Sequence, residues 1–311
     1  MRYRTLGDVR VGAVGLGAMP LSIEGRPDEE RAVATVHAAL DAGVSLIDTA
    51  DSYHLPGAAP GHNELLVARA LASYGGPTDH VLVTTKGGRG RPADGSWTVD
   101  GDPRHLRAAA HASLKRLGVP QLGLYQLHKP DPGVPYAESL GALRELLAEG
   151  TIRAAGISNA DTDQIRLARE VLGEGLVSVQ NRYSPAVRDS EAELRLTAEL
   201  GLTFMPWSPL GGIARSALEG PAARGGADGS GDARFRAFHE VAEERGVSPQ
   251  RVCLAWLLAA SPNVLPIPGA SRPETIRDSA AAADLRLSAD ELARLDDAGR
   301  LDEARRLDGS A

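Results

Sequence analysis

Short apolar segments alternate along the chain with longer segments in which apolar residues recur every three or four positions. The short segments break off abruptly at polar residues, which is typical of buried strands. Eight such strands are expected, at Ala13–Leu16, Val44–Ile47, Val81–Thr85, Leu122–Leu127, Ala154–Ile157, Leu176–Val179, Thr203–Pro206 and Val264–Ile267.

The longer segments have the spacing of amphipathic helices and carry recognisable end signals. Asp161 and Ser248 suit N-cap positions, Pro103 suits a first turn, and Gly118 and Gly150 follow the last apolar residues as C-terminal stops. Helices are expected at Glu29–Ala42, Asn63–Ser73, Pro103–Leu117, Tyr136–Ala148, Thr162–Val171, Ser190–Leu200, Pro249–Ala260 and Pro273–Ala283.

Eight strands alternating with eight helices favour an α/β fold, the (β/α)8 TIM barrel, which typically occupies ~250 residues. We therefore expect residues 1–311 to form a single TIM-barrel domain, although a doubly wound parallel sheet is an alternative with similar alternation. Further expected features are an N-terminal β-hairpin (Arg2–Leu6 with Val9–Val11), long loops after strands three and seven (Gly87–Gly101 and Gly211–Gly231), and extra helices at Phe235–Arg245 and Ser288–Gly299.

Composition narrows the classes of partner. The chain has 42% hydrophobic and 24% charged residues, and its 41 acidic and 34 basic residues give a net charge of −7. This balance, with no long basic run, argues against binding to nucleic acid or to an anionic membrane.

The single cysteine, Cys253, lies in an apolar stretch and suits a buried thiol in a reducing compartment. No apolar run is long enough to span a membrane, so a cytoplasmic location is expected.

Candidate chemistry gathers where three expected strands end. Asp48, Lys86 and His128 stand at the ends of strands two, three and four, and Tyr53 follows Asp48 by five residues. In a TIM barrel the C-terminal strand ends face the active site, and adjacent strands lie ~4.8 Å apart, so the four side chains can meet. Lys86 is one of only three lysines in the chain, which suggests a role that arginine cannot fill.

These four residue types suit carbonyl reduction. The ammonium of Lys86 is expected to lower the pKa of the Tyr53 hydroxyl, and the carboxylate of Asp48 to keep that ammonium charged. His128 can donate a hydrogen bond to the tyrosine or to a substrate oxygen. The set would form a general acid beside a carbonyl that receives hydride from a nicotinamide.

The chain resembles the aldo-keto reductases over nearly its whole length. The resemblance rests on motifs in family order: Leu46–Ala50 leading to Tyr53, Thr84–Lys86, Leu124–His128, Gly156–Asn159, Val179–Tyr183, Trp207–Leu210 and Ile267–Arg272. It implies that Tyr53 is the proton donor, that Lys86 and Asp48 are its electrostatic partners, and that His128 orients the substrate.

The same resemblance implies a binding site for NADPH. Ser158, Asn159 and Gln180 would hold the nicotinamide carboxamide, Trp207 would stack on its ring, and Arg272 would bind the 2′-phosphate near a helix N-terminus. Asp278 and Ser279, late in this motif, are further expected cofactor contacts, although related sequences often have an acidic residue followed by asparagine there. The remaining expected cofactor contacts are Gly17, Met19, Ser208, Pro209, Leu210, Ile267, Pro268, Gly269 and Ser271.

The substrate is less well defined. His54 and Trp97 are expected to wall the pocket, and the segment from Leu127 to Pro132 resembles bacterial pyridoxal-reductase-like members, which suggests a small aldehyde or ketone. Lys129 could attract an anionic substrate or be an ordinary exposed charge.

Three other functions compete with reduction. A Schiff-base lyase would use Lys86 as nucleophile but leaves the cofactor motifs unexplained. A regulatory protein that binds NADPH without turnover would not need the intact catalytic tetrad of Asp48, Tyr53, Lys86 and His128. A metal hydrolase lacks a His-x-His ligand pattern, so no metal is expected. The sequence does not indicate an oligomeric state.

Overall fold

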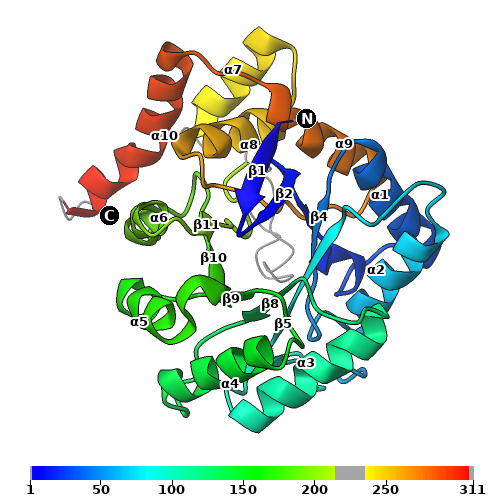
Figure 1. The fold of residues 1–311 in the computed structure, drawn as a ribbon. Coiled ribbons are helices and arrows are strands. Elements are labelled where there is room, and N and C mark those ends of the chain that lie inside the picture. Colours follow the sequence, from blue (N-terminus) through cyan, green and yellow to red (C-terminus); the bar gives the residue numbers. More distant parts are fainter. Residues whose placement is uncertain (1, 214–234, 308–311) are drawn as a thin grey trace.

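One curled sheet of seven parallel strands organises the molecule (Figure 1). The computed structural model describes residues 2–213 and 235–307. The strands lie in the order β11-β10-β9-β8-β5-β4-β3, so consecutive strands are neighbours and all carboxyl ends reach the same edge. Their bounds are β3 (Leu16–Gly17), β4 (Leu46–Asp48), β5 (Leu82–Gly87), β8 (Leu124–Leu127), β9 (Ala155–Ser158), β10 (Leu176–Gln180) and β11 (Thr203–Phe204).

The two edge strands, β3 and β11, are joined through residues 264–269. Val264 bridges Phe204 of β11, and Gly269 bridges Gly17 of β3, both in parallel orientation. Residues 264–267 were expected to be the eighth strand, but no strand is assigned there. Pro266 and Pro268 explain the difference, because proline has no N–H to donate to a ladder. The segment does accept hydrogen bonds, from the N–H groups of Gly15 and Gly17 to the carbonyl oxygens of these prolines, at 3.0 Å each.

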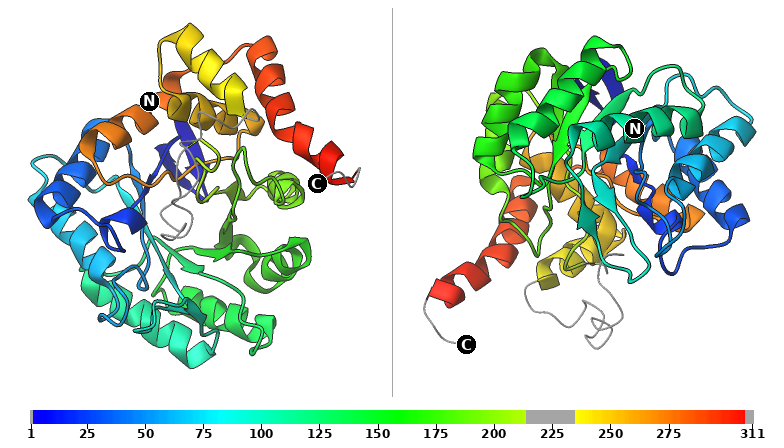
Figure 2. Two further views of the ribbon diagram at one scale, coloured as in Figure 1. Left: turned by 180° about the vertical axis from the view of Figure 1, so that it is seen from behind. Right: turned by 90° about the horizontal axis from the view of Figure 1, so that it is seen from below.

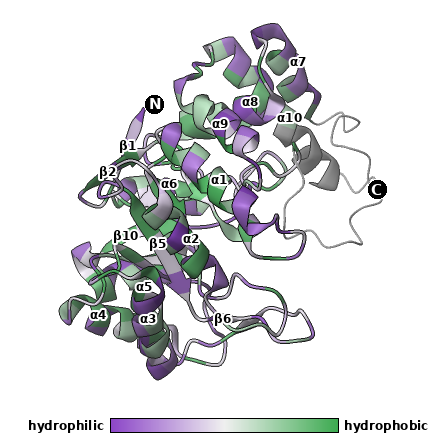
Figure 3. Cartoon of the chain, turned by 90° about the vertical axis from the view of Figure 1, so that its right-hand side faces the viewer, coloured by the Kyte–Doolittle hydropathy of each residue, from purple (hydrophilic) through white to green (hydrophobic). Residues whose placement is uncertain are grey.

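Helices surround the curled sheet in front and rear views (Figures 1 and 2). Figure 3 shows that these helices carry both hydrophobic and hydrophilic residues, as expected for elements that pack on a sheet and also meet solvent. The helices that follow the strands are α1 (Glu29–Asp41), α2 (His62–Ser73), α3 (Pro103–Leu117), α4 (Tyr136–Ala148), α5 (Thr162–Leu172), α6 (Glu191–Glu199), α8 (Pro249–Ala260) and α9 (Pro273–Ala281).

Two further helices, α7 (Arg236–Arg245) and α10 (Ala289–Leu307), lie beside α8, and α10 extends away from the body of the molecule (Figure 2). Helix α10 is longer than the expected Ser288–Gly299. Short 3₁₀ turns are η1 (Met19–Leu21), η2 (Gly173–Gly175) and η6 (Ala282–Asp284).

Helix ends follow the local chemistry of the sequence. The side chain of Asp161 caps α5 in a capping box with Gln164, and Ser248 caps α8 by accepting from the N–H of Arg251. Helix α3 begins at Pro103 after Asp102 and ends before Gly118, which adopts a left-handed conformation. Proline and glycine signals thus fixed α3 and α8 at their expected bounds.

The N-terminal hairpin, β1 (Tyr3–Leu6) and β2 (Val9–Gly12), closes one end of the curled sheet. Its buried residues Leu6 and Val11 belong to the apolar cluster that also holds Leu46, Leu124 and Leu265 from the inside of the sheet. The amino-terminal end of the sheet interior is therefore filled by side chains, which leaves the carboxyl end for a site.

The first of the two expected long loops has secondary structure of its own. Residues 87–101 contain a second small hairpin, β6 (Arg89–Gly90) with β7 (Thr98–Val99). Most of the expected loop Gly211–Gly231 lies outside the described residues. Within the described ranges, no helix has the length and apolar character needed to cross a bilayer.

Candidate active site

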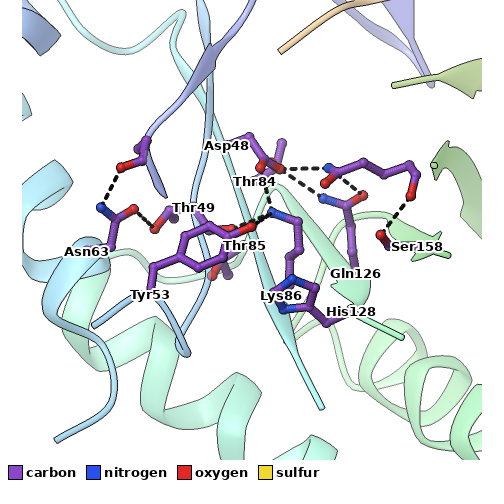
Figure 4. Close-up of polar contacts among 12 residues, drawn as sticks. Asp48, Thr49, Tyr53, Asn63, Thr84, Thr85, Lys86, Gln126, His128 and Ser158 are labelled. Atoms are coloured by element: carbon purple, nitrogen blue, oxygen red, sulfur yellow. Dashed lines mark hydrogen bonds and ion pairs between the residues drawn. The ribbon is translucent and has the colours of Figure 1, made fainter. Parts of the chain in front are cut away.

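Three neighbouring strands bring Asp48, Lys86 and His128 together. Asp48 ends β4, Lys86 lies near the end of β5, and His128 follows β8 directly. The parallel register places Asp48 opposite Thr84 and Lys86 opposite Gln126, so Lys86 and His128 each lie two residues beyond the position paired with the previous strand and point to the same face of the sheet as Asp48. Figure 4 shows these side chains together with Tyr53.

A continuous polar chain joins Asp48, Lys86 and Tyr53 (Figure 4). The Nζ atom of Lys86 donates to Oδ2 of Asp48 at 2.5 Å, to the carbonyl oxygen of Thr49 at 2.9 Å and to the hydroxyl of Tyr53 at 3.2 Å. Lys86 is fully buried, which by itself lowers the pKa of its ammonium, but Asp48 and Tyr53 outweigh burial and raise it overall. Lys86 therefore stays positively charged at neutral pH.

The carboxylate of Asp48 is oriented by three further donors. Its Oδ1 accepts from the hydroxyl of Thr84 at 2.8 Å, from Nε2 of Gln180 at 2.9 Å and from Nε2 of Gln126 at 3.3 Å. Sequence reasoning missed Thr84 and Gln126 as supports of the site. The period of two along a strand could have identified them, because each stands two residues before Lys86 or His128.

The pKa of Tyr53 differs from the expectation. Burial raises the pKa of its hydroxyl and Asp48 adds to the rise, and together they outweigh the lowering by Lys86. The net shift is upward, whereas a lowered value was expected from the ammonium alone. Tyr53 is therefore fully protonated at neutral pH and can act as a hydrogen-bond and proton donor.

His128 is neutral in this environment. Burial is the main cause of its strongly lowered pKa, and Lys86 and Arg89 lower it further. The Oγ atom of Ser52 lies 3.4 Å from its Nδ1, and its ring meets that of Tyr53 edge-on at 5.6 Å between centroids. A neutral imidazole here offers one donor and one acceptor beside Tyr53.

The loop that carries Tyr53 is tied to the rest of the fold by buried contacts. Asn63 of α2 accepts from the hydroxyl of Thr49 at 2.5 Å and donates to the carbonyl of Ala18 at 2.8 Å. Asp51, in the same loop, is buried near Glu64 and has an Oδ1 atom without a hydrogen-bond partner in the described part of the chain. Burial and Glu64 raise its pKa to about 8.

A cavity of about 630 Å³ opens at the carboxyl end of the sheet beside these residues. Sequence-predicted residues that line it are Gly17, Met19, Asp48, Tyr53, Trp97, His128, Ser158, Asn159, Gln180, Trp207, Ser208, Pro209, Leu210, Ile267, Gly269, Ser271, Arg272, Asp278 and Ser279. The catalytic end and the expected phosphate end thus belong to one continuous cavity.

Three sequence-predicted residues do not line this cavity. Lys86 lies beneath its surface, in contact with Tyr53. His54 is buried, with Nδ1 2.8 Å from the carbonyl oxygen of Leu55, so it does not form the expected substrate wall. Pro268 contributes only a backbone carbonyl, which accepts from the N–H of Gly17.

The residues around the cavity suit a nicotinamide dinucleotide. Ser158 and Asn159 lie side by side, with Asn159 donating to the Ser158 hydroxyl at 3.0 Å, and they present the mixed donors and acceptors that an amide needs. The indole N–H of Trp207 is buried without a hydrogen-bond partner in the described ranges. At Gly17 a Cβ atom would lie 2.7 Å from the carbonyl oxygen of Ile267, so glycine permits the close backbone approach beside the cavity.

Gln180 has an additional role that was not expected. Its amide nitrogen is engaged by Asp48, and its backbone carbonyl accepts from the Ser158 hydroxyl at 2.7 Å. Gln180 therefore links the expected carboxamide site to the carboxylate of Asp48.

Arg272 stands at the N-terminus of α9 and lines the same cavity as Tyr53. Its Nε lies 3.5 Å from a carboxylate oxygen of Glu274, and both side chains are largely exposed. Asp278 is already bound by Arg251 at 2.6 Å and by the hydroxyl of Ser248, whereas Ser279 is buried. Arg272 is therefore the cation available for a phosphate at this helix end.

Sequence reasoning also missed residues of the cavity wall, and Arg89 is the most notable of them. Arg89 follows Lys86 by three residues, on β6, and lines the cavity with Trp97. Its place just past a strand end was a usable signal, since such positions face the site. The other lining residues are Pro20, Gly211, Gln250, Ala270, Glu274 and Thr275. Lys129 is exposed and is not among the lining residues.

Comparisons with known proteins agree with this geometry. Residues 13–300 match the model of the aldo/keto reductase family. Pyridoxine 4-dehydrogenase of Escherichia coli is 33% identical over 300 residues, covering 93% of this chain and 95% of that protein. The 6-dehydroglucose reductase of Novosphingobium aromaticivorans is 34% identical over 289 residues, covering 91% of each.

Solved structures give the same result. A glycerol dehydrogenase from Gluconobacter oxydans superposes with a TM-score of 0.81 at 29% identity, covering 96% of this chain and 95% of that one. An aldo/keto reductase from Klebsiella pneumoniae, solved with NADP and acetate, gives a TM-score of 0.75 at 30% identity, covering 95% and 94%. The resemblance and the cofactor expected from the sequence are thus confirmed. The chain belongs to the aldo/keto reductase family and is an NAD(P)H-dependent oxidoreductase.

Proposed function

We propose that this chain reduces a small aldehyde or ketone to the alcohol, with hydride from NADPH and a proton from Tyr53. The observation that carries the proposal is the buried chain from Asp48 through Lys86 to the Tyr53 hydroxyl, which ends at the cavity wall. Bound NADPH supplies the hydride. Tyr53 donates its proton to the developing alkoxide, and the ammonium of Lys86, 3.2 Å away, stabilises the phenolate that remains.

His128 and the cofactor-binding residues have supporting roles in this proposal. His128, held neutral by burial, donates a hydrogen bond to the substrate oxygen and so orients it toward Tyr53. Ser158, Asn159 and Gln180 hold the carboxamide, Trp207 stacks on the ring, and the segment from Ile267 to Arg272 holds the phosphates. These roles are supported by the common cavity that all of these residues, apart from Pro268, line.

We also infer that residues 1–311 act as one domain and that residues 264–269 serve as the eighth position of a (β/α)8 barrel. The bridges from this segment to both edge strands support that reading.

The main alternative on the same site, a Schiff-base lyase, is disfavoured by the state of Lys86. A lysine must lose its proton to attack a carbonyl, whereas Asp48 and Tyr53 raise the pKa of Lys86. Its Nζ atom is also surrounded by three acceptors and lies beneath the cavity surface.

The proposal is tested by following NADPH absorbance with a panel of small aldehydes and ketones that includes pyridoxal and glyceraldehyde, because relatives act on related alcohols. Single-turnover mixing with excess enzyme separates a reductase from a protein that only binds the cofactor. Oxidation of bound NADPH by at least one aldehyde is expected, and stable NADPH with every carbonyl in the panel would contradict reduction.

A further inference from the structure

The cavity wall near Tyr53 and His128 carries an arginine that has no carboxylate partner among the described residues. Two arginines line the cavity among the described residues, Arg89 and Arg272. Arg272 has Glu274 nearby, whereas Arg89 has no carboxylate within ion-pair distance in residues 2–213 and 235–307. Arg89 lies close enough to Tyr53 and His128 to act on them electrostatically, so its charge is felt where the carbonyl would bind.

The guanidinium of Arg89 is held rather than free to turn away. Arg89 pairs with Val99 across the small hairpin, and its Cζ lies 4.8 Å from the centroid of the Trp97 ring. Arg91 contacts the same ring at 4.1 Å and is itself anchored by an ion pair with Glu24. Trp97 is therefore in contact with two cations, of which only Arg91 has a carboxylate partner in the described part of the chain.

Arg89 also retains unused hydrogen-bonding capacity. Its Nε atom is buried and has no hydrogen-bond partner among the described residues. Burial lowers the pKa of its guanidinium, which reflects the cost of holding this charge away from water. A guanidinium that stacks on an aromatic ring keeps its N–H donors at its edge, where they match the two oxygens of a carboxylate or phosphate.

We propose that Arg89, positioned by Trp97, binds an anionic group of the substrate, so that the preferred carbonyl compound carries a carboxylate or a phosphate. The carbonyl would lie at Tyr53 and His128 and the anion at Arg89. This inference rests on the proposed carbonyl reduction and adds the chemical class of substrate. Lys129, the cation suggested by sequence, is exposed and outside the cavity, so it does not take this role.

The test compares matched anionic and neutral aldehydes. The carboxylate pair is 4-carboxybenzaldehyde and 4-methylbenzaldehyde, and the phosphate pair is glyceraldehyde 3-phosphate and glyceraldehyde. Wild-type protein should prefer the anionic member of at least one pair in kcat/KM. Arg89→Met should lower kcat/KM for that member about ten- to a hundredfold, the usual effect of losing a hydrogen bond to a charged group. The neutral member should lose clearly less than the anionic member, because it makes no such bond and feels only the change in charge beside Tyr53 and His128.

Two controls distinguish binding from other effects. Lys129→Met removes the same charge from an exposed position and should leave the anionic preference intact, which tests general electrostatic attraction. Arg89→Lys should retain more of the anionic preference than Arg89→Met, because lysine keeps the positive charge but lacks the paired N–H donors of a guanidinium. NADPH affinity of every variant, measured by tryptophan fluorescence, should match wild type and shows that the site is folded.

The possible outcomes are separable. Equal losses for both members of each pair in Arg89→Met would overturn the inference, since they indicate a purely structural role. A wild-type protein that reduces neutral aldehydes with no anionic preference would also overturn it while leaving the proposed function intact. A wild-type protein that binds NADPH but reduces none of these four aldehydes would overturn the inference, and the proposed reduction fails as well only if NADPH stays stable with the whole panel of carbonyls.

Discussion

The Nζ atom of Lys86 lies 3.2 Å from the hydroxyl oxygen of Tyr53, inside the protein and one layer below the cavity surface. Burial raises the pKa of the tyrosine and the ammonium partly offsets this rise. In the proposed reduction the tyrosine would keep its proton until a substrate takes it, and the Tyr53 phenolate would form beside a positive charge. This one contact would let a weak acid serve as a proton donor at neutral pH.

Tyr53→Phe should lower the rate of carbonyl reduction about 10²- to 10⁴-fold, the usual contribution of a general acid. NADPH should still quench tryptophan fluorescence, because Phe keeps the ring and Lys86 keeps its bonds to Asp48 and Thr49. Tyr136→Phe is a matched control, since the Tyr136 hydroxyl has no hydrogen-bond partner among the described residues. Turnover retained in Tyr53→Phe would remove Tyr53 as the acid.

The pair Asp48 and Lys86 should show strong coupling in stability. Lys86→Met leaves the Asp48 carboxylate buried without its cation and should cost about 3–5 kcal/mol in the free energy of unfolding. Adding Asp48→Asn removes the stranded charge, so the double variant should be more stable than the sum of the two single losses predicts. Urea denaturation of the four proteins measures the coupling. Additive losses would mean that the buried ion pair in the structure contributes little.

The sequence located the strand exits well because buried parallel strands are largely apolar, and Asp48, Lys86 and His128 lie at or just past the carboxyl ends of their strands. The strands predicted at Thr203–Pro206 and Val264–Ile267 are longer than the pairing observed. Pro206, Pro266 and Pro268 lack the N–H donors that a ladder needs, while the side chains of these segments still pack. The hydrophobic pattern of a sequence shows which residues are buried. Strand pairing also depends on backbone N–H donors, which that pattern does not show.

The site was predicted less completely than the fold for a different reason. The direction of the Tyr53 pKa depends on how deeply the hydroxyl is buried, which a list of neighbouring charges does not reveal. His54 was expected to line the substrate pocket because it follows Tyr53, but Nδ1 of its ring lies beside the carbonyl oxygen of Leu55 in its own loop. Arg89 was missed because its contact with Trp97 crosses a hairpin that had been interpreted as an open loop.

Arg272→Ala should weaken NADPH binding about ten- to a hundredfold through loss of charged hydrogen bonds to the 2′-phosphate. NADH lacks that phosphate, so its affinity should change by less than about twofold. Glu274→Gln is an informative companion, because the Glu274 carboxylate lies 3.5 Å from Nε of Arg272 and competes with the phosphate. That variant should bind NADPH slightly more tightly. Equal losses of both cofactors in Arg272→Ala, measured by fluorescence titration, would contradict the assignment.

Asp51→Asn should change how stability depends on pH. The pKa of Asp51 is about 8 in the folded protein, because of burial and the nearby Glu64, against about 4 in an unfolded chain. Between these values unfolding releases a proton, so wild-type stability should fall with rising pH by up to about 1.4 kcal/mol per pH unit from this residue. Asparagine does not ionise, so the stability of Asp51→Asn relative to wild type should rise from pH 4 to pH 8 and then level off.

Thermal unfolding across this range tests the prediction. The control is Asp79→Asn, because Asp79 is an exposed aspartate in a loop. Parallel curves for wild type and Asp51→Asn would mean that Asp51 is ionised in the folded protein, and that Arg116 and Lys86, the two cations that lower its pKa, outweigh its burial.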